Sequence, residues 1–352
     1  MHFNFCSGEF RKERVTGVLF YFLFLFSAIQ AQDWIRSGIV HTINAEFDNA
    51  IAIYQDEIRA QPQDFRAHFY LAAAIHSRMI HFENQEGEQP FDLAITRTIE
   101  LIQNRLQSEQ NPSALDLAQY WFYLGSAYGY RAYAQGRTGK WLAALSNGMK
   151  ANGYLHDAIR EDSTLYDAYL GIGTYKYWRT SKLSFIYWLP FLPDEREDGI
   201  QMIKKAADSD GLSRDLARHQ LVYILLDYGR NEEAISYAQQ LVADYPQSQF
   251  MYWALAHSCY KSEKYGDAEK AYLYLEYLIE QDPHRNLNHL LNCKLKLALI
   301  YSSVQDDNNC IQQCTSLIEL YRGYSEKEKF GKIDQAEKLM KRVKERNQVP
   351  AE

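Results

Sequence analysis

Large and small apolar residues recur along this chain at fixed offsets. In the segment that begins at Ala31, positions 4, 8, 17, 20, 24 and 32 hold Trp34, Gly38, Phe47, Ala50, Tyr54 and Pro62. The next segment begins 34 residues later, at Phe65. Small residues at positions 8 and 20 let two helix backbones approach, and large residues at 4 and 24 fill the space between turns. The pattern predicts a helix, a turn and a second helix in each segment, stacked on the next segment.

The same offsets predict about seven such helix pairs. Later segments begin near Ala118, Tyr166, Asp215 and Gln249, and a weaker one carries Leu297, Ala298, Tyr301, Cys310 and Cys314. A last apolar face, opposite a charged one, is formed by Phe330, Ile333, Leu339, Met340 and Val343. A helix of this kind covers the exposed end of a repeat stack and keeps it soluble.

From residue 31 to 324 this pattern resembles the tetratricopeptide repeat (TPR) family. The resemblance implies an all-α fold, namely a right-handed α-solenoid of about seven TPR-like helix pairs with an amphipathic C-terminal capping helix. It also implies a protein-binding scaffold, which is the family's role. We expect the solenoid at 32–324, followed by the capping helix and a tail at 325–352. The preceding residues, 1–31, are expected to be a signal peptide on the separate grounds given below.

In three segments the stretch between the two predicted helices is longer than the 34-residue repeat requires. The extra residues predict lengthened turns near 78–92, 132–146 and 179–195, which would lie on one edge of the solenoid as a lateral lobe. The third is rich in aromatic residues, namely Phe185, Tyr187, Trp188 and Phe191. These rings either fold back onto the lobe or form a docking site for a partner or a membrane surface.

The inner face of such a solenoid is formed mainly by the first helix of each pair. The residues expected to form a concave, partner-binding groove there are Phe69, Phe122, Tyr130, Tyr177, Trp178, His219, Tyr223, Trp253, His257 and Tyr260. Few of them are charged, so binding of a C-terminal carboxylate by Lys, Arg and Asn, known in some TPR domains, is not carried over. An apolar or aromatic-rich peptide suits this groove better. The other interpretation is that many of these rings only pack neighbouring first helices.

The N-terminus has the order of a secretory signal. Arg11, Lys12 and Arg14 precede an apolar run from Val18 to Ile29, and cleavage is expected near Ala31. About 12 apolar residues are too few for an ordinary membrane-spanning helix, which needs roughly 20. We expect an exported protein, periplasmic or extracellular after cleavage, with an uncleaved membrane anchor as the alternative.

Charge and cysteines add two expectations. Loss of the three basic and two acidic residues of 1–31 would move the net charge from -7 to -8, which gives no case for nucleic acid binding. The mature chain has four cysteines, Cys259, Cys293, Cys310 and Cys314, and an even number in an exported protein permits disulfides. Cys310 and Cys314 are expected as buried free thiols, because they hold repeat positions 20 and 24 between the helices. If a disulfide forms, the preferred pair is Cys259 with Cys293.

Sequence signals for catalysis are poor. Gly136 to Lys140 lacks the upstream glycine and the following Ser or Thr of a phosphate-binding loop. His76 and His81 are five residues apart and do not share a helix face as a metal-binding pair would. No catalytic residue, metal or cofactor is predicted. The leading hypothesis is a non-enzymatic scaffold for a protein or peptide partner in the cell envelope. The alternative is a periplasmic binding component that delivers an apolar small ligand to a transport system.

Overall fold

The computed structural model describes residues 34–182, 193–322 and 331–346, and all regular structure in these ranges is helical. The helices are 34–43, α2 (Phe47–Ala60), α3 (Phe65–His81), α4 (Glu88–Ser108), α5 (Ala114–Arg137), α6 (Trp141–Glu161), α7 (Asp167–Lys182), α8 (Arg196–Ala207), α9 (Arg214–Tyr228), α10 (Asn231–Asp244), α11 (Gln249–Lys261), α12 (Tyr265–Gln281), α13 (Leu287–Ser303), α14 (Asp307–Arg322) and α15 (Gly331–Arg346). None of the described helices is long and apolar enough to cross a membrane.

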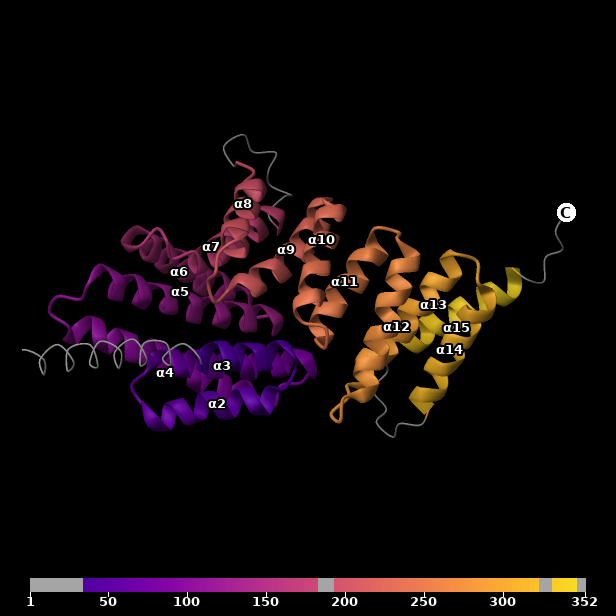
Figure 1. The fold of residues 1–352 in the computed structure, drawn as a ribbon, viewed down its shortest axis with the longest axis horizontal. Helices are drawn as coiled ribbons and strands as arrows, with labels where there is room; N and C mark the ends of the chain where they lie inside the picture. Colours follow the sequence, from indigo (N-terminus) through magenta and orange to yellow (C-terminus); the bar gives the residue numbers. More distant parts are fainter. Residues whose placement is uncertain (1–33, 183–192, 323–330, 347–352) are drawn as a thin grey trace, which may run out of the picture.

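Successive helices pack in pairs, and the pairs stack along the long axis of the molecule (Figure 1). The first helices of the described pairs are 34–43, α3, α5, α7, α9, α11 and α13, and each is followed by its second helix. Helix α15 packs against α13 and α14 and buries Ala336, Leu339 and Val343. The predicted all-α solenoid and the apolar face of its terminal helix are therefore confirmed.

Close helix contacts occur at the positions that the sequence pattern assigned to them. A Cβ atom on Gly38 would lie 2.3 Å from Cζ of Tyr54. The backbone of the first helix at Gly38 therefore contacts the ring of Tyr54 in α2 directly. A Cβ atom on Gly173 would lie 2.5 Å from the carbonyl oxygen of Gly199 and 2.7 Å from Cγ1 of Ile203. Only glycine fits at these two sites, which confirms the predicted positions 8, 20 and 24.

The predicted lengthened turns are instead mostly helical. Helix α3 continues to His81 and α5 to Arg137, so the turns shrink to residues 82–87 and 138–140. No proline interrupts either first helix, and Gly139 makes the second turn with a φ of 76°, which glycine adopts without strain. The extra residues therefore lengthen helices rather than form loose loops. Most of the third expected turn, residues 183–192, lies outside the described residues, and this range includes Phe185, Tyr187, Trp188 and Phe191. The N-terminal segment 1–33 also lies outside the described residues.

The solenoid turns back on itself, and its first two helix pairs touch the sixth and seventh. Ser248 Oγ donates a hydrogen bond of 2.6 Å to the carbonyl oxygen of Ile43, and Asn286 Nδ2 donates one of 2.8 Å to that of His81. The rings of Phe47 and Phe250 meet edge to face at 6.3 Å. We call this contact of residues 43–47 and 81–83 with 248–250 and 286–289 the seam.

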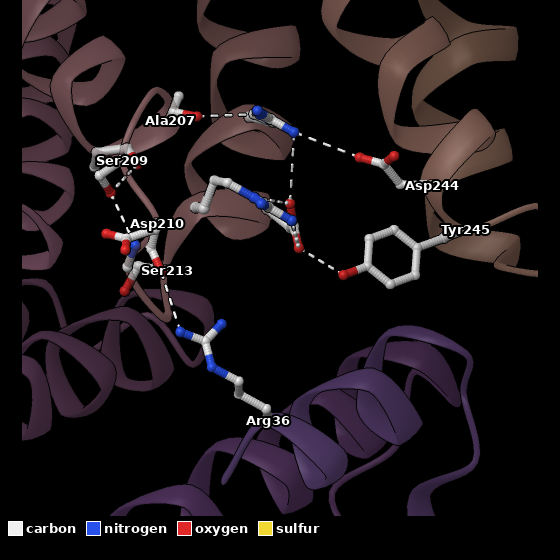
Figure 2. A network of polar contacts seen from close by, with 12 residues as sticks. Arg36, Ala207, Ser209, Asp210, Ser213, Asp244 and Tyr245 are labelled. Atoms are coloured by element: carbon white, nitrogen blue, oxygen red, sulfur yellow. Dashed lines mark hydrogen bonds and ion pairs between the residues drawn. The ribbon is translucent and has the colours of Figure 1, made fainter. Parts of the chain in front are cut away.

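A further contact holds helix 34–43 beside the middle of the solenoid. The Arg36 side chain extends from this helix to the loop between α8 and α9 and donates a hydrogen bond of 3.1 Å to the Asp210 carbonyl oxygen (Figure 2). Asp167, at the start of α7, accepts from the backbone of Ser213 in the same loop at 2.8 Å. The first helix pair is therefore tied to several later pairs as well as to its sequence neighbour.

The four cysteines in the described part of the chain are free and buried. This confirms the expectation of buried thiols for Cys310 and Cys314. Cys259 and Cys293 are free as well, so the disulfide considered for them is not formed. Burial raises the pKa of both the Cys259 and the Cys293 thiol, which keeps them in the unreactive protonated form.

Candidate partner-binding surface

Three of the residues expected in an open groove belong to the core instead. Phe69, Phe122 and Tyr177 expose at most 8% of their surface. Phe69 packs edge to face against Tyr123 at 5.2 Å, and the Tyr177 hydroxyl donates a hydrogen bond of 2.6 Å to Asp227. The prediction that these three rings bind a partner is wrong, because neighbouring first helices already cover them.

Two further residues of the expected groove, Trp253 and His219, contact residues of the seam. The Trp253 ring lies 5.8 Å from that of His289, and its indole nitrogen is buried without a hydrogen-bond partner among the described residues. His219, on α9, bonds to the backbone of Phe250, and burial lowers its pKa to about 4. His289 and Phe250 belong to the seam, so both side chains pack directly beside it.

Two aromatic residues lie between the core and the surface. Tyr130 packs edge to face against Phe69 at 5.6 Å and against His76 at 5.4 Å, and burial raises its pKa to about 12. Trp178 is half-buried and meets the Tyr177 ring at 5.2 Å. Tyr130 thus packs α5 against α3, whereas the Trp178 ring meets a residue of its own helix.

The remaining three residues lie on α9 and α11, and Lys296 extends their surface to α13. The rings of Tyr223 and His257 stack at 6.1 Å, which joins α9 to α11. The ammonium group of Lys296, on α13, lies 4.6 Å from the centre of the Tyr260 ring. Lys261 follows Tyr260 at the end of α11 and is exposed. We call Tyr223, His257, Tyr260, Lys261 and Lys296 the α9–α13 strip.

Positive charge distinguishes the α9–α13 strip from the aromatic groove that was expected. Burial lowers the pKa of Lys296, and the positive charge of Lys261 lowers it further. The pKa of His257 is lowered by burial and by both lysines. Neither lysine has an ion-pair partner in the described ranges. Two unpaired cations beside aromatic rings can bind a carboxylate and pack an aromatic or aliphatic side chain.

Sequence reasoning missed both lysines. Lys261 directly follows a residue that was chosen for its aromatic ring, and Lys296 lies in the seventh pair, whose first helix had not been included in the groove. The available signal was the position of each lysine in a first helix. Charge alone would not have separated them from the solvent-exposed lysines elsewhere.

A cavity lies at the seam and does not include the α9–α13 strip. It has a volume of about 1160 Å³ and is lined mainly by polar residues of the two ends, among them Asp48, Arg78, Glu83, Asp282 and Asn286. Sequence reasoning did not predict it, because its walls come from distant segments. Within the described ranges, no group of three or more His, Cys, Asp or Glu residues is placed to hold a metal ion.

No protein-family model matches the sequence, and no curated protein matches it. Among solved structures, a chain of the APC/C hetero-tetramer Cut9–Hcn1 is similar over 88% of this chain, with a TM-score of 0.51 and 13% identity. This chain spans 48% of that one. The C-terminal part of a TPR repeat-containing protein from Cytophaga hutchinsonii is similar over 87% of this chain and 99% of its own, with a TM-score of 0.46 and 14% identity.

A third similar structure is PilF of Pseudomonas aeruginosa, with a TM-score of 0.43 and 15% identity over 79% of this chain and 99% of its own. At these sequence identities the similarity concerns the fold alone. The fold assignment rests on the Cut9–Hcn1 chain, whose TM-score is 0.51. The chain has the helical-repeat fold of TPR proteins.

Proposed function

We propose that this chain is a non-enzymatic TPR-like scaffold that binds an extended segment of a protein partner on the α9–α13 strip. The fold supports a helical-repeat scaffold of the kind used in protein–protein interaction. The strip holds Tyr223, His257 and Tyr260 of the expected groove, all partly exposed, together with two lysines of α11 and α13. Its residues come from three successive first helices, so an extended peptide can lie across them.

The unpaired lysines carry this proposal. Holding Lys296 half-buried beside Lys261 is unfavourable for the free protein, as the lowered pKa of Lys296 shows. A carboxylate placed between the two ammonium groups would remove that repulsion and form charge-assisted hydrogen bonds. Tyr223 and Tyr260 offer apolar ring surface on either side. We therefore expect the bound segment to combine an acidic residue with an aromatic or aliphatic one.

Selection from a displayed peptide library tests this specificity. Peptides retained by the chain should be enriched in Asp or Glu next to an apolar residue, and their binding should weaken with salt. Lys296→Ala should weaken binding about tenfold, as expected for loss of one hydrogen bond to a charged group. Lys270→Ala, at an exposed lysine of α12, is the control and should leave binding unchanged. Enrichment of basic peptides, or equal binding by both variants, would contradict the proposal.

Export to the cell envelope is the second part of the proposal, and it rests on the signal-like residues 1–31. Intact mass of the protein from the envelope fraction should correspond to a chain that begins at Gln32. A chain that keeps residues 1–31 would indicate an anchor instead. The alternative function, binding of an apolar small ligand for a transport system, stays a prediction, and thermal stabilisation by lipid-like or aromatic ligands would favour it.

A further inference from the structure

Helix α6 carries a stripe of large apolar side chains that point into solvent. Trp141 is 71% exposed, Leu142 86%, Leu145 57% and Met149 55%. At 3.6 residues per turn, all four lie within an arc of about 100° on one face of the helix. Isolated exposed leucines are common, but a contiguous stripe of this kind marks a surface that meets an apolar partner. We call these four residues the α6 stripe.

A neighbouring face of α6 holds the helix in the solenoid. Ala151, Leu155 and Ala158 are buried, and a Cβ atom on Gly148 would lie 3.8 Å from the Tyr175 ring of α7. The α6 stripe is therefore a separate surface from the packing face, and the solenoid presents it rigidly. It also belongs to a different part of the molecule from the α9–α13 strip.

The hairpin of α5 and α6 contains the longest stretch of this acidic chain without an acidic residue. No Asp or Glu occurs between Asp116 and Asp157, although the whole chain has a net charge of -7. The same segment contains Arg137, Lys140 and Lys150 next to the α6 stripe. Arg137 and Lys140 have no ion-pair partner among the residues that the structure describes.

We propose that the α6 stripe binds the surface of a bilayer that contains anionic phospholipids. Apolar residues with a tryptophan on one helix face, flanked by Lys and Arg, are the composition of helices that lie in the headgroup region. The lipid phosphates complement Arg137 and Lys140, while the acyl boundary accepts Trp141, Leu142 and Leu145. A protein partner would need no such exclusion of carboxylates along the whole hairpin. This contact goes beyond the proposed scaffold function and does not depend on it.

A fluorophore placed within the α6 stripe tests this contact locally. The full chain is labelled with a nitrobenzoxadiazole group at Leu145→Cys, in a Cys6→Ser background, because the four cysteines of the described residues are buried. Local detection matters because the apolar run at 18–29 could itself bind vesicles. On vesicles of phosphatidylcholine with phosphatidylserine, the emission should shift to the blue and become stronger. Vesicles of phosphatidylcholine alone should produce a much smaller change.

Matched variants distinguish binding through the α6 stripe from non-specific adsorption of the protein to vesicles. A label at Leu115→Cys, 62% exposed on α5 beside Asp116, should not respond to either vesicle. Lys140→Gln should lower the partition of the Leu145 label roughly fivefold, the effect of one basic residue near an anionic surface. Lys270→Gln, an exposed lysine on α12, should leave the partition unchanged.

Three results would overturn the proposal. The first is a Leu145 label that does not change on anionic vesicles. The second is a label already in an apolar environment before vesicles are added, because another part of the chain would then cover the stripe. The third is a label that responds to lipid-free envelope proteins and not to vesicles, which would assign the stripe to a protein partner.

Discussion

His81 and His289 pack edge to face across the seam, with their ring centres 5.0 Å apart. One ring comes from the end of α3 and the other from the start of α13, so their contact joins the second helix pair to the seventh. Nε2 of His81 and Nδ1 of His289 are buried without a hydrogen-bond partner among the described residues. Burial lowers the pKa of both imidazoles to about 4, and His289 contributes to the decrease at His81. At neutral pH both are therefore uncharged in the folded chain.

The seam should weaken as the pH falls from about 6.5 toward 4. The unfolded chain binds protons on these imidazoles near pH 6.5, whereas the folded chain does not until about pH 4. Stability that is present above pH 6.5 is therefore lost below it. At pH 5 we expect each histidine to lower the free energy of unfolding by about 2 kcal/mol relative to pH 7.5. Urea unfolding of the chain at both pH values measures the difference.

His81→Phe should reduce this pH dependence by the contribution of one imidazole, because a phenyl ring fills the site and does not titrate. Other buried histidines, such as His76 and His219, also contribute to the pH dependence of the free energy of unfolding, but they do so equally in the unmodified chain and in the variant. His284→Gln, at an exposed position, is the control and should keep the full dependence. Equal slopes for His81→Phe and the unmodified chain would show that the seam is not pH-sensitive.

Gly173→Ala should destabilise the solenoid by about 3 kcal/mol, because the added methyl group overlaps the Gly199 carbonyl oxygen. Gly266→Ala is the matched change, since a Cβ atom on Gly266 in α12 meets nothing within 4 Å. It should stabilise the chain by about 0.5–1 kcal/mol through the lower flexibility of alanine. Thermal or urea unfolding compares the two. Similar stability for both variants would refute the close approach of α7 and α8.

A buried ion pair joins α12 to α13 through Glu276 and Lys294, whose side chains are 12% and 11% exposed. Lys294→Met leaves the Glu276 carboxylate buried alone and should lower the free energy of unfolding by about 3–5 kcal/mol. Adding Glu276→Leu should restore most of the loss, because two apolar side chains can fill the same space. A double variant less stable than the single one would mean that the pair itself provides the stability.

The repeat positions could be predicted because they depend on local packing. Gly38 against Tyr54 and Gly173 against Gly199 are contacts within one helix pair, so each leaves a spacing in the sequence. The seam left none. It brings His81 beside His289 through small rotations accumulated over several pairs, and no spacing in the sequence records their sum.

That closure also explains why part of the expected groove lies beside the seam. Trp253 and His219 occupy first-helix positions that would face a partner in an open solenoid, but here Trp253 packs against His289 and His219 bonds to the Phe250 backbone, and both of these partners are seam residues. The accessible end of the same face, around Tyr260 and Lys296, could be found only after the closure was known. Extra residues in the third pair were likewise misassigned, because sequence length alone does not separate a longer turn from longer helices such as α5.

Photo-crosslinking in the native cell tests the central claim, that the α9–α13 strip binds a protein partner. Benzoylphenylalanine is placed at Tyr260 in one strain and at Tyr277, 52% exposed on α12, in another. We predict a discrete protein adduct at Tyr260, none at Tyr277, and loss of the adduct when Lys261→Glu and Lys296→Glu are added. No adduct at Tyr260, or one that persists after both charge reversals, would contradict it.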